Sequence, residues 1–258
     1  AEAHSNLGLI LRDLGSLKKA EKSTRKSIDI NPDYATAYSN LGSILTDLGR
    51  LEEAKEAYQR CIDMDPQGIH YIPNLIYILS TLCMSDEIEK YIPSLNQIGI
   101  VGKGINPFPL MYVEDNPENH LKRSIRFCNQ NFKVKSMPLN LDVKEKINIG
   151  YFSADFNNHP VMHMMSSIFK LHNKDKFNIY LYYFGNKEDD YTQKIKEVGC
   201  NFKNINKLND LEAFDVARKD QLDIGIDLMG FTKNNRMRIF SYRIAPIQIN
   251  YLGFPGTT

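Results

Sequence analysis

The chain has 258 residues, a net charge of +1, 42% hydrophobic residues and 24% charged residues. This is an ordinary composition for a folded protein with room for two domains, and the small net charge excludes neither enzyme nor scaffold. It gives no indication of nucleic acid or an anionic membrane as a partner. No apolar run approaches the roughly 20 residues that a membrane span requires, and no signal peptide is recognisable. The four cysteines lie far apart without a CxxC pair, so we expect reduced thiols in a cytoplasmic protein.

Residues 1–95 contain a repeat with a period of 34 residues. Asn6-Leu7-Gly8 recurs as Asn40-Leu41-Gly42, and Asp13-Leu14-Gly15 recurs as Asp47-Leu48-Gly49. Each unit predicts two helices that are joined at a glycine turn and end at a proline, which resembles the tetratricopeptide repeat. A third unit is degenerate, with Cys83 at the position of the turn glycine. Because the chain begins inside a first helix, we expect further repeats to precede it.

An asparagine recurs at one repeat position, as Asn6, Asn40 and Asn74. Asparagine forms helices poorly, so its recurrence suggests a role other than helix formation. We expect these amides to form a ladder on the concave face of the array that binds the backbone of an extended peptide. The alternative is a hydrogen bond between helices or a solvated side chain.

Residues 96–146 predict a connector with a loop, a helix over 117–131 and a linker. Residues 147–258 then alternate strands and helices. Strands are predicted over 147–153, 177–184, 201–205, 222–229 and 246–253, and helices over 160–171, 188–198, 208–220 and 236–243. This alternation is typical of a parallel, doubly wound sheet. Ligands bind at the carboxyl edge of such a sheet, so we expect the site in the loops 153–159, 184–187, 229–233 and 252–258.

The first of these loops carries the main catalytic candidate, His159. It precedes Pro160, a preferred first residue of a helix, and a neutral imidazole there can accept a proton near neutral pH. His159 and His163 also have the spacing of metal ligands, but they lack the intervening glutamate of HExxH and a third ligand. We therefore predict no metal site and expect His163 to pack or to cap the helix.

The last two loops carry candidate binding residues. Thr232, Lys233 and Arg236 stand before or at the start of a helix, where cations oppose the helix dipole. An anion such as a diphosphate would explain them, and solvated surface charge is the alternative. The final loop contains two glycines, Gly253 and Gly256, which allow close approach of a ligand.

Three segments together resemble the protein O-linked N-acetylglucosamine transferase family, which includes the SPINDLY-type enzymes. They are NPFPLMYVEDNPENHLKRSIRF, INIGYFSADFNNHPVMHMM and LDIGIDLMGFTKNNRMRIFSYRIAPIQINYLGFPGTT, and they follow the repeats in the family's order. Phe231 and Phe254 depart from the family's usual aromatic residues, and Ile244 replaces a proline.

The resemblance implies a fold, an activity and site residues. The fold is a helical tetratricopeptide array followed by part of a Rossmann-like parallel-sheet lobe of a GT-B-type glycosyltransferase, with a second lobe expected after residue 258. The reaction is a metal-independent, inverting transfer of N-acetylglucosamine from UDP-N-acetylglucosamine to protein serine or threonine hydroxyls, with no cofactor. His159 matches a proposed general base and Asp215 a proposed proton relay. The residues expected to bind substrate are Thr232, Arg236, Leu252, Gly253, Pro255, Gly256 and Thr257.

Two alternatives stay open. The donor sugar could be fucose, as in some SPINDLY-type members, or the chain could be a repeat scaffold with a vestigial α/β module. We expect residues 1–258 alone to be inactive, and the repeats could also mediate an oligomer.

Overall fold

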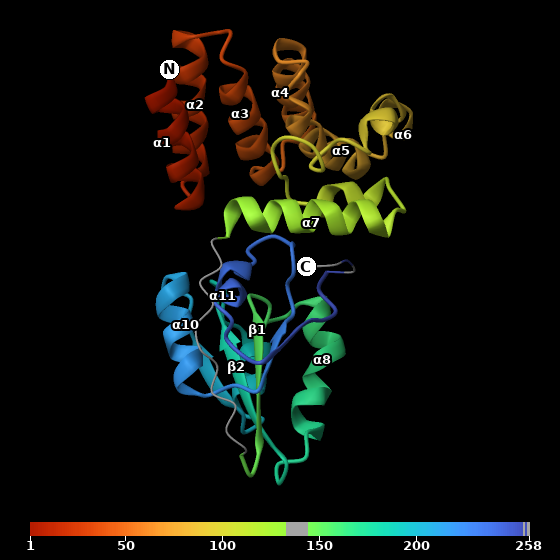
Figure 1. Cartoon of the computed structure of the whole chain (residues 1–258). Coiled ribbons are helices and arrows are strands. Elements are labelled where there is room, and N and C mark those ends of the chain that lie inside the picture. Colours follow the sequence, from red (N-terminus) through yellow and green to blue (C-terminus); the bar gives the residue numbers. More distant parts are fainter. Residues whose placement is uncertain (133–143, 255, 257–258) are drawn as a thin grey trace. The chain divides into compact units, whose positions relative to one another are not determined.

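The computed structural model describes residues 1–132, 144–254 and 256, and it divides into two compact units, Ala1–Phe127 and Cys128–Thr258 (Figure 1). The first unit consists of helices, and the second is built on a parallel sheet. Both predicted fold classes are confirmed.

Paired antiparallel helices form the first unit. They are α1 (Glu2–Asp13), α2 (Leu17–Ile30), α3 (Ala35–Asp47) and α4 (Leu51–Met64), followed by η1 (Ile69–Tyr71) and α5 (Ile72–Thr81). Small residues bring the paired helices close together. A Cβ atom added to Gly8 would lie 2.1 Å from Oγ1 of Thr24, and Ala20 and Ala54 are fully buried.

The turn between paired helices has the same conformation in all three units. Gly15 and Gly49 adopt φ angles of +73° and +75°, and Cys83 adopts +57° at the equivalent position. At each turn this residue's N–H donates to a carbonyl three residues back, and the next N–H donates to a carbonyl five residues back. The third unit therefore keeps a left-handed turn that favours glycine, although its residue there is cysteine.

The third unit loses its second regular helix. A short helix, α6 (Ser85–Ile88), passes directly into the 3₁₀ segment η2 (Glu89–Ser94), which contains Pro93. Proline lacks the N–H that a continuing α-helix requires, which explains the interruption. The chain then continues through η3 (Phe108–Tyr112) into α7 (Pro117–Asn131), within which the boundary between the two units falls.

A buried arginine organises the end of this unit. The Arg123 guanidinium is fully buried, forms an ion pair with Glu114, and donates to the carbonyls of Ile98 and Leu95. Its charge is balanced by Glu114, and it supplies hydrogen bonds to both carbonyls. Arg123 thereby fixes the segment that precedes α7.

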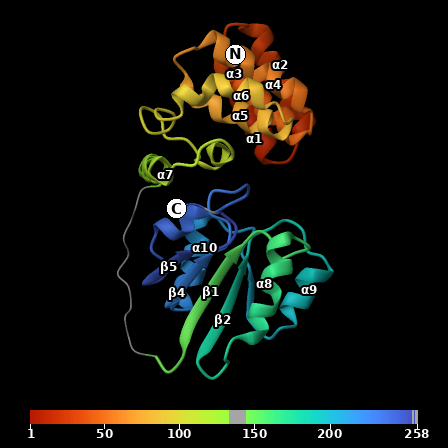
Figure 2. The ribbon, with the colours of Figure 1, turned by 90° about the vertical axis from the view of Figure 1, so that its right-hand side faces the viewer.

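The second unit has five parallel strands in the order β3-β2-β1-β4-β5. The strands are β1 (Ile147–Ser153), β2 (Phe177–Tyr183), β3 (Asn201–Asn204), β4 (Ile224–Asp227) and β5 (Ile247–Asn250). The helices are α8 (Pro160–Leu171), α9 (Asp190–Lys196), α10 (Asp210–Lys219) and α11 (Met237–Ser241). Two hydrophobic clusters lie on opposite faces of the sheet, one with α8 and α9 and the other with α10 and α11. Figure 2 shows α8 and α9 together on one side of β1 and β2.

Four strands are shorter than predicted: β2 and β3 by one residue each, and β4 and β5 by half of their expected length. The expected strand 222–229 ends at Asp227, because the Asp227 carboxylate accepts hydrogen bonds from the N–H groups of Met229 and Gly230 and turns the chain out of the sheet. The strand predicted over 246–253 ends at Asn250, shortly before Leu252 adopts a φ of +73°. The buried hydrophobic residues that follow these strand ends, such as Leu228, Met229 and Phe254, belong to loops at the edge of the sheet.

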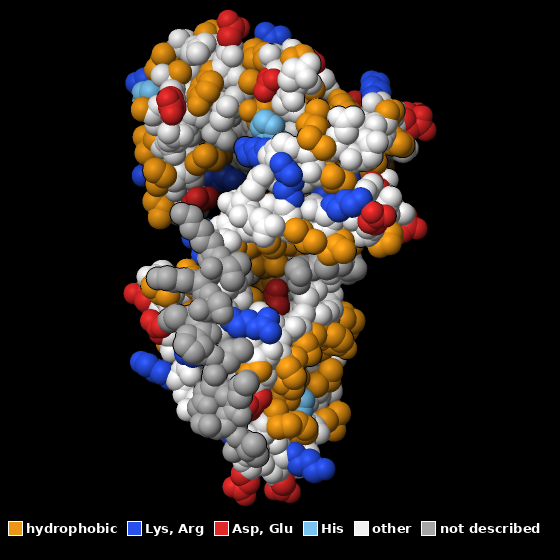
Figure 3. All heavy atoms as spheres, in the orientation of Figure 1, with side chains coloured by type: hydrophobic (Ala, Val, Ile, Leu, Met, Phe, Trp, Pro, Cys, Tyr) orange, Lys and Arg blue, Asp and Glu red, His pale blue; other side chains and the backbone are white. Residues whose placement is uncertain are grey.

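Hydrophobic side chains gather on the outer surface over α8 (Figure 3). On this helix Met164 is 59% exposed and Leu171 is 79% exposed, so the helix is apolar on more than its buried face. Within the described residues, every helix is too short or too polar to cross a membrane.

Candidate functional site

The loops that follow the strands lie against one another at the carboxyl edge of the sheet. A Cβ atom on Gly185 would lie 2.2 Å from the carbonyl oxygen of Ala154, so the loop after β2 touches the loop after β1. A Cβ atom on Gly253 would lie 1.8 Å from the carbonyl oxygen of Leu228, so the loop after β5 touches the loop after β4. These positions require glycine because the approaching atoms belong to the backbone.

His159 is the N-cap residue of α8. Its backbone is extended, with φ −139° and ψ 146°, and its Nδ1 atom accepts a hydrogen bond from the Val161 N–H at 3.3 Å. Pro160 takes the first helical position, where its missing N–H leaves no bond unmade. The side chain is 41% exposed. The imidazole is therefore held at the helix start through Nδ1, with part of the ring exposed.

Asp155 lies one turn before His159 and was not selected as a site residue from the sequence. Its Oδ2 atom is 3.6 Å from Nδ1 of His159, and its side chain is 21% exposed. Burial raises the pKa of the Asp155 carboxyl, and the neighbouring His159 opposes this effect. The spacing of an acid four residues before a histidine is the sequence signal that could have identified it.

His163 supports the loop that leads to His159. Its Nε2 atom is 3.0 Å from Oδ1 of Asn158, and its Nδ1 atom is 2.9 Å from the Tyr191 hydroxyl. The Asn158 N–H also donates to the Asp189 carboxylate at 2.8 Å. The expectation that His163 is packed is wrong, because it is exposed and bonds to the preceding loop. Within the described part of the chain, no group of three or more histidine, cysteine or acidic residues could hold a metal ion.

The loop after β5 contains several expected binding residues. Leu252 is 38% exposed and adopts a positive φ, which is strained for a residue other than glycine. Gly253 lies directly against the Leu228 backbone. The rings of Phe254 and Phe231 are both buried and meet edge to face at 5.1 Å, which explains aromatic residues without a polar group at both positions. Gly256 is described, whereas Pro255 and Thr257 lie outside the described residues.

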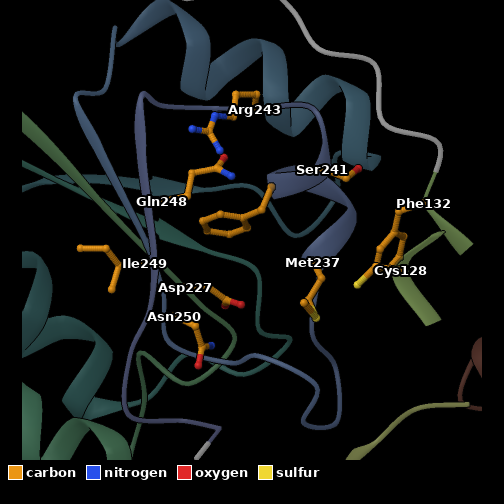
Figure 4. A pocket seen from close by; sticks show the side chains of 10 residues that line it. Cys128, Phe132, Asp227, Met237, Ser241, Arg243, Gln248, Ile249 and Asn250 are labelled. Carbon is orange, nitrogen blue, oxygen red and sulfur yellow. The ribbon is translucent and has the colours of Figure 1, made fainter. Parts of the chain in front are cut away.

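A cavity of about 350 Å³ lies beside β5 and α11 (Figure 4). Figure 4 shows the Asp227 carboxylate next to the Asn250 amide at the strand ends. Asp227 is 6% exposed, and burial raises the pKa of its carboxyl although two backbone N–H groups oppose the shift. The cavity is lined by Cys128, Phe132, Asp227, Met237, Phe240, Ser241, Arg243, Gln248, Ile249 and Asn250. His159 is not among these residues, so the cavity is separate from the imidazole.

Comparison with known proteins gives the family. The model of glycosyl transferase family 41 matches residues 123–258, more than half of the chain. The chain belongs to glycosyl transferase family 41. A tetratricopeptide repeat model matches residues 1–67, which confirms the first two repeats.

Relatives within this family are considerably longer. Over 127 residues the chain is 35% identical to "Probable UDP-N-acetylglucosamine--peptide N-acetylglucosaminyltransferase SEC" of Arabidopsis thaliana, covering 47% of this chain and 13% of that protein. Over 117 residues it is 33% identical to the UDP-N-acetylglucosamine--peptide N-acetylglucosaminyltransferase of Caenorhabditis elegans. This match covers 44% of this chain and 10% of that protein. A solved mutant of the Thermobaculum terrenum O-GlcNAc transferase shares the fold, with a TM-score of 0.67 and 22% identity, over 98% of this chain and 50% of that chain.

In this family 41 chain, Arg236 has protein partners in place of the expected anion. Its Nε atom donates to the Asp210 carboxylate at 2.7 Å, and its Nη1 and Nη2 atoms donate to the carbonyls of Ile205 and Leu208 at 2.9 and 2.8 Å. Its side chain is 15% exposed, so it is not a solvated surface charge either. Thr232 likewise bonds locally, with its hydroxyl donating to the Met229 carbonyl at 2.8 Å. Both side chains stabilise loops of the family 41 lobe.

Asp215 lies away from His159 in the family 41 lobe. It is exposed on α10, whose buried side carries Phe214 and Ala217, and α10 covers the opposite face of the sheet from α8 (Figure 1). The structure therefore does not bring Asp215 and His159 together. Asp210, at the start of α10, forms an ion pair with Arg236, which precedes α11.

The repeated asparagines differ in their surroundings. Asn6 is exposed, whereas Asn40 and Asn74 are half-buried. The Asn40 amide donates to the Ser5 hydroxyl at 2.8 Å, which links α3 to α1. For Asn40 the hydrogen bond between helices therefore exists, and it orients the amide rather than leaving it free to rotate.

Proposed function

We propose that this chain forms the repeat array and part of the first catalytic lobe of a protein O-GlcNAc transferase. The enzyme transfers N-acetylglucosamine from UDP-N-acetylglucosamine to serine or threonine hydroxyls of proteins, with inversion and without a metal or cofactor. The observation that carries the proposal is His159, an N-cap imidazole at the ligand edge of a family 41 lobe, with Nε2 directed away from its capping bond.

His159 acts as the general base in this reaction. The acceptor oxygen attacks the anomeric carbon and forms the new C–O bond, while the bond from that carbon to the diphosphate breaks and its electron pair leaves with UDP. The hydroxyl proton moves to Nε2 of His159. Taking up this proton requires the neutral tautomer whose proton is on Nδ1, and a positioned base of this kind contributes about 10²–10⁴-fold in rate.

The repeats supply the acceptor-binding surface in this proposal. Asn6, Asn40 and Asn74 present amides at one repeat position, which suits the backbone of an extended peptide. Replacing all three by alanine raises KM for a protein acceptor while leaving hydrolysis of the donor unchanged. An oligomer mediated by the repeats would show in the mass measured by light scattering.

The test compares two variants of the protein that carries residues 1–258 in full. His159→Asn removes the imidazole but keeps a side chain that caps helices well, so the variant folds while transfer falls about 100-fold or more. His172→Gln changes the same residue type at the other end of α8 and leaves transfer within about 2-fold of the wild type. Equal activity of His159→Asn and wild type contradicts the role of His159.

The donor and the metal are tested in the same assay. Both UDP-N-acetylglucosamine and GDP-fucose are offered, with and without EDTA. Transfer only from the fucose donor shows the alternative sugar specificity, and no transfer from either donor indicates a scaffold. Loss of transfer in EDTA contradicts metal independence.

A further inference from the structure

We propose that Asp155 is a positioning residue for His159, because it holds a proton on Nδ1 and so leaves the Nε2 lone pair free to act as the base. This inference rests on the proposed transfer reaction and adds a residue to it. The juxtaposition that carries it is a carboxylate oxygen 3.6 Å from Nδ1 of the imidazole.

The turn between β1 and α8 fixes the backbone of Asp155. The Asp155 N–H donates to the Ser153 hydroxyl at 2.9 Å, and its carbonyl accepts from the Asn157 N–H at 2.7 Å. The backbone is therefore held on both sides of the carboxylate. The backbone of His159, one turn later, is fixed at the start of α8, so local hydrogen bonds set the backbone positions of both residues.

The Asp155 carboxylate has an unusual lack of donors. Among the described residues, no N–H or O–H group donates a hydrogen bond to it, and its charged neighbour is His159. The side chain is 21% exposed, and carboxylates that lose most of their contact with water are normally hydrogen-bonded to protein donors. An Nδ1–H group on His159 is the donor that would satisfy it.

The other ionisable groups near this loop are already occupied. Asp189 accepts from the Asn158 and Thr192 N–H groups, and His163 contacts Asn158 and the Tyr191 hydroxyl. The hydrogen bonds of these two side chains go to groups other than the His159 ring. Within the described residues, Asp155 is thus the carboxylate that can select the tautomer of His159.

The two contacts of Nδ1 correspond to different tautomers. When Nδ1 accepts from the Val161 N–H, the neutral ring carries its proton on Nε2, which can then only donate. When Nδ1 carries the proton and donates to Asp155, Nε2 has a lone pair and can take the acceptor proton. The resulting imidazolium lies beside a carboxylate that stabilises its charge, as in the acid–histidine pairs of hydrolases.

The first experiment measures the tautomer directly and needs no activity. Long-range ¹H–¹⁵N spectra of the 258-residue chain report which ring nitrogen of His159 carries the proton. We expect a populated Nδ1–H tautomer in the wild type and its loss in Asp155→Asn, which leaves the capping tautomer. Asp189→Asn removes a nearby charge without a contact to the ring and should leave the tautomer ratio of the wild type. An unchanged ratio in Asp155→Asn overturns the proposal.

The second experiment measures transfer by the protein that carries the chain in full. Asp155→Asn lowers kcat about 100-fold or more while KM for the donor changes less than about 2-fold, and Asp155→Glu restores part of kcat. The positioning role is overturned if Asp155→Asn raises only KM. It is also overturned if Asp155→Asn and Asp155→Glu lose no more kcat than Asp189→Asn does. If the wild type transfers no sugar, the proposed function fails, whereas the spectra still decide whether Asp155 selects the tautomer.

Discussion

Replacing Arg236 by methionine distinguishes a structural arginine from one that binds the donor. Methionine retains an unbranched side chain but removes three hydrogen bonds from the guanidinium, to Asp210 and to the carbonyls of Ile205 and Leu208. Hydrogen bonds to a charged group contribute about 1.5–3 kcal/mol, and bonds from one group are not additive. Because Arg236 is 15% exposed and Asp210 is 31% exposed, we expect a loss of about 3 kcal/mol in the free energy of unfolding.

The assay combines thermal unfolding with hydrogen exchange. For a unit of this size, about 3 kcal/mol lowers Tm by roughly 10 °C. Amide exchange should increase around residues 205–212, whose carbonyls lose their donor. Arg238→Met, at an exposed arginine on α11, serves as the matched control and should leave Tm unchanged.

The opposite pattern would refute this reasoning. If Arg236→Met unfolds at the temperature of the wild type but raises KM for the nucleotide sugar, the arginine binds the donor diphosphate. A parallel loss in Asp210→Asn, with no further loss in the double variant, would show that the two side chains act as one pair.

Three further predictions concern other parts of the chain. Cys83→Gly should raise stability by about 1 kcal/mol in urea unfolding, because its φ of +57° favours glycine, and an unchanged midpoint would contradict this. With a thiol reagent at pH 8, the exposed Cys83 should react rapidly and Cys61 slowly, because burial raises the pKa of Cys61 to about 12 and leaves almost no thiolate below it. Gly253→Ala should lower the free energy of unfolding by about 1–3 kcal/mol and reduce transfer, because the added Cβ would lie 1.8 Å from the Leu228 carbonyl oxygen. A stability and a transfer rate equal to those of the wild type would show that the loop can move away.

Much of the fold follows from local sequence patterns. The period of 34 residues predicts the paired helices, and β1 and α8 have the bounds expected from hydrophobic patterning and from Pro160. These features depend on residues close in sequence, so a single sequence is sufficient to predict them. The resemblance of the histidine–proline segment and the final loop to one family also predicted the family that the comparisons show.

The partners of charged residues could not be predicted in this way. Arg236 and Asp210 are separated by 26 positions, and nothing local to either residue indicates that they pair. The same holds for Asp215, whose outward direction depends on which face of α10 packs on the sheet. The sequence therefore suggested a ligand for Arg236 but could not show the protein partners that its guanidinium has in the folded unit.

The sequence by itself determined the repeats, the parallel sheet and the position of His159 at a helix start, because periodicity, turn residues and capping act over a few residues. Only the tertiary structure decided that no donor among the described residues reaches the Asp155 carboxylate, that Gly253 touches Leu228 and that Arg236 pairs with Asp210. Each of these three features depends on which loops lie side by side at the edge of the sheet. The loops in turn decide which donors and acceptors come within reach of one another. That geometry is set by the packing of the whole unit rather than by any one segment.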